Sequence, residues 1–178
     1  APTSRWIGCR KQGDRHFATQ FSASGTMLTN TVLPGRGHGI AVSPDARTAL
    51  VIARRPGTYA LLIDLETGHE VTRIESADDR HFYGHACFST DGDKLFLTEN
   101  NIRTGDGMVS VRDVQNDLKT LTQFSSGGIG PHELRLMGDG NTLAVANGGI
   151  LTRPDTGRTA LNLETMSPSL VLIDSTTG

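Results

Sequence analysis

The chain lacks long hydrophobic runs: no stretch approaches the ~18 apolar residues that a transmembrane helix needs. We therefore expect no membrane span. A basic excess is also missing, because 17 Lys and Arg residues stand against 19 Asp and Glu residues. This near balance excludes a polybasic protein that binds nucleic acid. The segment APTSRW at the N-terminus has neither the basic nor the apolar region of an export signal.

Cysteine is scarce, and the two that occur are Cys9 and Cys87. There is no Cys-x-x-Cys pair and no group of Cys and His at the spacing of a structural zinc site. The two thiols either form a disulfide or are buried as free thiols. Their apolar surroundings, WIGCR and HACFS, favour free buried thiols. The motifs of serine hydrolases, HExxH metalloproteases and P-loop nucleotide-binding proteins are absent as well.

Glycine and threonine are abundant, at 21 residues each, which is typical of short strands joined by tight turns. Three segments repeat one layout: a strand, an Asp/Gly turn, a strand, a variable loop and a strand ending in Asp. They cover residues 37–75, 84–124 and 130–178. The turns SPDA, TDGD and GDGN place Asp and Gly where a hairpin needs positive φ and a side-chain acceptor. We expect the strand-ending Asp64, Asp113 and Asp174 to accept hydrogen bonds from turn amides.

A four-stranded unit that recurs about every 40–50 residues is typical of a propeller blade. The sequence therefore predicts an all-β fold, a β-propeller of four-stranded antiparallel blades, with a β-sandwich of hairpins as the alternative. We expect residues 1–178 to form one partial propeller of about three and a half blades. Its blades span residues 5–35 (partial, with Trp6 in its core), 37–82, 84–129 and 130–178 (without a fourth strand). Such an array is either the N-terminal half of a longer, seven-bladed ring or closes by pairing with a second copy.

Several long strings, among them GRGHGIAVSPD, GGIGPHELRL and TRPDTGR, resemble a bacterial family of uncharacterised exported proteins. That family carries a twin-arginine export signal and is similar to the YVTN-repeat and quinoprotein amine dehydrogenase-like propellers. The resemblance covers essentially the whole chain. It implies a periplasmic location and no particular chemistry. Its members tend to be encoded near imelysin-like iron-uptake proteins, which implies a link to iron or metal handling and a periplasmic protein partner.

His38, His85 and His132 recur at 47-residue intervals, each at the entry to the first strand of a unit. First strands line the channel of a propeller, so the three imidazoles can converge and hold a divalent transition metal with a position left open. Counted from the turn aspartates, however, His38 and His132 lie seven residues ahead and His85 only six. Because a one-residue shift reverses the face of a strand, His85 is either displaced by a bulge or points elsewhere. A purely structural role, like that of Gly-His in WD-repeat propellers, is the alternative.

Other polar residues are expected on the same face, where the loops between second and third strands open. Arg54 is suited to clamp an anion through two hydrogen bonds, and turn capping is the alternative for it. The longest connection, Gly148–Ser167, is expected to be a lid, a docking surface or a solvated loop. The residues predicted to bind a small polar or anionic ligand are Arg54, Glu99, Asn100, Glu133, Asn147 and Arg153.

These patterns favour a non-catalytic periplasmic propeller that binds a small polar ligand or a divalent transition metal at its channel mouth. A protein-interaction scaffold that uses the loops of the same face is a second hypothesis. An oxidoreductase-like enzyme, whose remaining groups lie in further blades, is a third.

Overall fold

The computed structural model describes residues 4–178, so residues 1–3 of the APTSRW segment lie outside the described part. In that part, fourteen strands form four antiparallel sheets of three or four strands. The first sheet contains β1 (Arg5–Gln12), β2 (Arg15–Ser22) and β3 (Met27–Leu33), and the second contains β4 (Gly37–Val42), β5 (Thr48–Ala53), β6 (Tyr59–Asp64) and β7 (Glu70–Glu75). The third contains β8 (Arg80–Phe88), β9 (Lys94–Asn101), β10 (Gly107–Asp113) and β11 (Lys119–Ser125), and the fourth contains β12 (Pro131–Leu136), β13 (Thr142–Asn147) and β14 (Ser169–Asp174).

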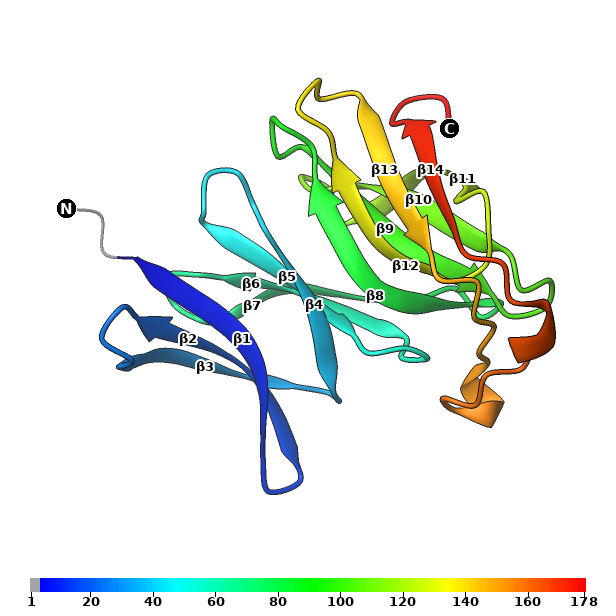
Figure 1. The fold of residues 1–178 in the computed structure, drawn as a ribbon. Coiled ribbons are helices and arrows are strands. Elements are labelled where there is room, and N and C mark those ends of the chain that lie inside the picture. The colour runs from blue at the N-terminus through cyan, green and yellow to red at the C-terminus, as the bar shows by residue number, and fades with distance from the viewer. Residues whose placement is uncertain (1–3) are drawn as a thin grey trace.

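The sheets follow one another along the chain, and the first strands of neighbouring sheets lie next to each other (Figure 1). Strand β4 contacts β8, and β8 contacts β12. Within each sheet the strands follow chain order, as in an up-and-down meander. This arrangement confirms the predicted fold class, an all-β array of antiparallel propeller blades. The longer, seven-bladed ring stays a prediction.

Apolar side chains from both faces of the inner sheets fill the spaces between neighbouring sheets. On β5, Leu50 and Ile52 pack toward the third sheet, whereas Val51 packs toward the first. On β9, Leu97 packs toward the second sheet and Phe96 toward the fourth. Because consecutive residues point to opposite faces, a strand buried on both faces must be apolar at nearly every position. This explains the continuous runs TALVIA and YALLID.

The outer faces of the two end sheets are exposed. Leu170 and Leu172 of β14 are 73% and 66% exposed, and Met27 of β3 is also largely exposed. Trp6, which the sequence analysis placed in the core of the first blade, is 68% exposed. That expectation was wrong because side chains alternate along β1: Ile7 and Cys9 pack toward the second sheet, and Trp6 lies on the other face, which no further sheet of the described residues covers.

The predicted turn chemistry is confirmed. Asp45 Oδ1 accepts a hydrogen bond from the Arg47 amide at 3.0 Å, and Asp139 Oδ1 accepts one from the Asn141 amide at 2.9 Å. Asp64 accepts from two turn amides, those of Glu66 and Thr67. The Ser43 hydroxyl donates to Asp45 and the Thr142 hydroxyl to Asp139. At these two aspartates the hydroxyls, and then the turn amides, favour the charged carboxylate and lower its pKa. At Asp64 the Thr67 amide is the main cause of the lowered pKa.

Both thiols are free in the structure, and each is half-buried on the first strand of its sheet. Burial raises the pKa of Cys9 and of Cys87 to about 11. Among residues 4–178, no helix is both long enough and apolar enough to cross a membrane.

The packing between the second and third sheets predicts the effect of one core substitution. Leu97 is fully buried there, and we expect Leu97→Ala to lower the free energy of unfolding by about 2–5 kcal/mol. Leu121→Ala, at an exposed position of β11, is the control and should cost under ~0.5 kcal/mol. Denaturant unfolding of both variants measures the difference, and equal losses would contradict the packing described above.

Candidate metal centre

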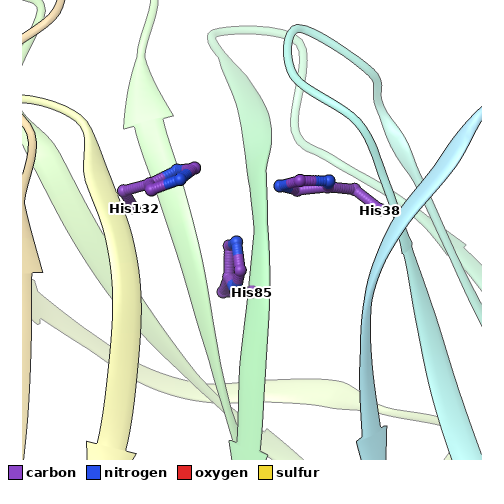
Figure 2. A group of neighbouring side chains, drawn as sticks. All are labelled: His38, His85 and His132. Carbon is purple, nitrogen blue, oxygen red and sulfur yellow. The ribbon is translucent and has the colours of Figure 1, made fainter.

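The structure brings His38, His85 and His132 together from β4, β8 and β12. The three rings point toward one another from neighbouring first strands (Figure 2). One ring nitrogen of each residue lies within 4.8 Å of the others. The ring centroids are 4.9 Å apart for His38 and His85, 5.0 Å for His85 and His132, and 5.9 Å for His38 and His132. The predicted convergence at the strand entries is therefore present, and His85 takes part in it.

A β-bulge at each histidine explains how the three side chains converge. The pairing of β4 with β5 shifts between Gly37 and Ile40, and that of β12 with β13 shifts between Pro131 and Glu133. In each case one extra residue is accommodated. In β8 the shift runs from Phe82 to Ala86, opposite Glu99 and Leu97, and accommodates two extra residues. His85 is one residue closer to its turn aspartate than the other two histidines are to theirs. In a regular strand this difference would place its side chain on the opposite face, and the larger bulge compensates for it.

Gly84 makes room for the cluster. Counted from the turn aspartates, Gly84 occupies the position in β8 that His38 and His132 occupy in their own strands. Its φ of +98° lies in the left-handed region that favours glycine. A Cβ atom built there would lie 2.7 Å from Cδ2 of His38. The third sheet therefore needs glycine at this position and supplies its imidazole from the next residue.

Glu133 holds His85 in a defined orientation. Its Oε2 lies 3.3 Å from Nδ1 of His85. Because a carboxylate only accepts, Nδ1 carries the proton of this contact and Nε2 of a neutral ring keeps its lone pair. In the described part of the chain, this buried Nε2 has no hydrogen-bond partner. It is thus a free acceptor inside the cluster.

Arg54 contacts the cluster at His38. Its Nη1 lies 3.2 Å from Nδ1 of His38. Its buried Nε has no partner among residues 4–178. Burial lowers the pKa of Arg54, and the nearby charges of Arg158, Arg36 and Arg55 lower it further.

The surroundings of all three imidazoles favour the neutral ring. Burial, then the charges of His85 and Arg54, lower the pKa of His38 to about 4. Burial is also the main cause of the lowered pKa of His85 and His132; Glu133 opposes it at both residues. A neutral imidazole has the lone pair that a metal ion requires, so these surroundings favour metal binding.

Three other predicted ligand-binding residues have partners inside the blades. Glu99 is 1% exposed and accepts hydrogen bonds from Ser110 and Arg112. Asn100 donates to the Gly105 carbonyl and accepts from the Gly130 amide. Their contacts explain both residues without a ligand.

Asn147 is also buried, and it exchanges two hydrogen bonds with Ser126, at 2.7 and 2.8 Å. Arg153 lies on the long connection, where its buried Nε has no partner among the described residues. Two of the six predicted ligand-binding residues, Arg54 and Glu133, contact the histidines. A ligand role for Arg153 stays a prediction.

The long connection between β13 and β14 is fixed to the third sheet. Tyr83 donates a hydrogen bond to the Ile150 carbonyl and accepts one from Arg55. His81, fully buried, lies with Nε2 3.2 Å from the Thr152 carbonyl. Two short 3-10 helices, η1 (Pro154–Thr156) and η2 (Leu163–Thr165), shape the connection.

Comparison with known proteins gives the family. Residues 31–178 match a family described as "Protein of unknown function (DUF1513)". The chain belongs to the DUF1513 family. This agrees with the resemblance to a family of uncharacterised proteins, whereas twin-arginine export stays an expectation. No curated protein matches the sequence.

Two solved structures are similar in fold. Hydrazine synthase of Kuenenia stuttgartiensis matches with a TM-score of 0.68 and 16% identity, over 91% of this chain and 43% of that one. A protein from Lactobacillus plantarum matches with a TM-score of 0.56 and 18% identity, over 89% of this chain and 48% of that one. The DUF1513 chain thus spans less than half the length of either. At these identities the likeness shows the fold alone.

The role of Gly84 yields a prediction. Gly84→Ala should lower the free energy of unfolding by about 1–3 kcal/mol, because the new Cβ combines backbone strain with a clash against His38. Gly8→Ala is the matched control, since a Cβ at Gly8 meets nothing within 4 Å. Thermal or denaturant unfolding compares the two variants. If Gly84→Ala is tolerated as well as Gly8→Ala, the third sheet does not need glycine at this position.

Proposed function

We propose that this DUF1513 chain is a non-catalytic binding protein that holds a divalent transition metal at His38, His85 and His132. The observation that carries the proposal is the convergence of three imidazoles, with one ring nitrogen of each within 4.8 Å of the others. Nε2 of His85 has no hydrogen-bond partner among residues 4–178. A buried acceptor without a donor costs free energy. A metal ion shared by the three rings would satisfy it.

A histidine elsewhere in the chain shows what a structural role looks like. His81 is also fully buried, but its Nδ1 lies 3.1 Å from the Phe82 carbonyl and its Nε2 lies 3.2 Å from that of Thr152. Both ring nitrogens therefore have polar neighbours from the backbone. His85 differs, because among residues 4–178 the one polar partner of its ring is the carboxylate of Glu133. A carboxylate that accepts a hydrogen bond from a metal-binding histidine is a common arrangement in metal sites.

Three histidine ligands leave a coordination position open, and imidazole suits Zn, Cu, Ni and Fe. The site can therefore accept a further ligand from solvent or from another molecule. We place the protein in the periplasm and in iron or metal handling with a partner protein. The family resemblance is the support for this part of the proposal.

A scaffold function is the second candidate, and the long connection is the observation that favours it. Asn162 braces it through hydrogen bonds to the Leu151 amide and the Gly149 carbonyl. Leu161, Leu163 and Met166 of this braced segment are exposed. A rigid loop with exposed apolar side chains can dock a protein partner.

The metal proposal predicts binding by the protein purified without a histidine tag. Zn²⁺ or Co²⁺ should bind at one ion per chain with micromolar or tighter affinity. In the His38→Ala/His132→Ala double variant the metal affinity should fall about 100-fold or more. Removing two ligands should cost more than removing a residue that supports a ligand, which costs about 10–100-fold. Equilibrium dialysis with metal analysis gives both numbers. His69→Ala, which removes an exposed histidine, should bind normally; equal binding by all three proteins would refute the site.

Glu133 supplies a separate prediction. Glu133→Gln removes the carboxylate that orients His85, so we expect metal affinity to fall about tenfold with unchanged stoichiometry. Chelator competition measures the affinity. Glu66→Gln, at an exposed position, controls for the lost negative charge. If the Glu133 variant binds the metal as tightly as the Glu66 control, Glu133 does not support the metal site.

A further inference from the structure

The hydrogen bond between Arg54 and His38 is incompatible with metal binding at His38. A guanidinium only donates, so Nδ1 of His38 is the acceptor in the 3.2 Å contact. If Nδ1 binds the metal, its lone pair is no longer available to Arg54. If Nε2 binds the metal, the proton of the neutral ring moves to Nδ1, which then cannot accept. Metal binding through either nitrogen therefore costs Arg54 this partner.

Arg54 would then lie beside a metal cation without an acceptor. Its buried Nε has no partner in the described part of the chain to begin with. Its electrostatic neighbours Arg36, Arg55 and Arg158 are also positive. Among residues 4–178, the carboxylate that pairs with the cluster is that of Glu133, on the His85 side. A dication at the centre increases this local excess of positive charge, which favours a bound anion.

A groove next to His38 is suited to admit that anion. It has a volume of about 770 Å³. Among the described residues, its lining has three cationic side chains, Arg10, Lys11 and Arg36, together with His16 and His38, and includes no carboxylate. A concave surface of one charge sign raises the local concentration of the opposite ion.

We propose that the centre binds its metal together with a small oxyanion, a carboxylate or a phosphate, that bridges the open metal position and the guanidinium of Arg54. The inference rests on the proposed metal site. An oxyanion offers one oxygen to the metal and another to Arg54, whose planar donors match carboxylate and phosphate groups. The released arginine thus regains an acceptor. Metal and anion then bind with positive coupling, and each raises the affinity for the other by the same factor.

Cobalt binding with acetate as the probe tests the coupling. Co²⁺ affinity is measured by chelator competition in perchlorate and in acetate at equal ionic strength, and visible absorption reports the ligands of the bound ion. For the native chain, acetate should tighten Co²⁺ binding about tenfold and change the spectrum. In Arg54→Gln both effects should vanish. Without acetate, this variant should bind Co²⁺ more tightly than the native chain, because no hydrogen bond to His38 must break.

Controls separate the inference from the metal proposal. Arg47→Gln removes a largely exposed arginine and should leave the acetate effect intact. If Arg54→Gln misfolds, Arg54→Lys is the second variant, because it keeps the positive charge. The lysine variant should retain only part of the acetate effect. If Co²⁺ binds but acetate has the same effect on all variants or none, the anion inference is overturned and the metal site survives. If no protein binds Co²⁺ in either salt, both are overturned.

Discussion

The candidate centre depends on the apolar packing of sheet against sheet. One sheet of this kind cannot bury both of its faces by itself, since Leu50 and Val51, adjacent on β5, point to opposite sides and each needs a neighbouring sheet to cover it. The contacts that cover them also set β4, β8 and β12 next to one another. His38, His85 and His132 belong to three different sheets, so their distances are a consequence of this packing and not of any local motif.

Two of these imidazoles contact a charged side chain. Arg54 contacts His38, and Glu133 contacts His85. The centre therefore has a basic contact at one histidine and an acidic contact at another. A histidine group that served only to fill space would need neither. The asymmetry sets the electrostatic conditions for any ligand that reaches the rings.

Much of the fold could be predicted from sequence because its signals are local. The Asp/Gly turns and the apolar strands repeat along the chain, and both follow from backbone conformation and alternating side chains. The position of His85 could not be predicted, because it depends on a two-residue bulge and on the φ of Gly84. The offset of His85 relative to the turn aspartates was the one sequence signal of that bulge.

The ligand role predicted for Glu99 and Asn100 came from placing them in a loop. Strand β9 runs to Asn101, so both are buried strand residues. Alternation of polar and apolar residues identifies strands with one exposed face. It does not identify a strand whose polar residues are buried between sheets and hydrogen-bonded there. Arg112 and Gly130, which satisfy these two side chains, are distant in sequence. Such partners are visible only in three dimensions.

The bulged entry of each first strand has a mechanical consequence. An ion held by rings from three sheets would connect these sheets at the entries of their first strands, where the strands of the described residues pair within their own sheets. Occupancy of the centre would then be linked to the separation of the blades. A protein built this way resists splaying of its sheets more strongly as the free ion concentration rises, by mass action alone.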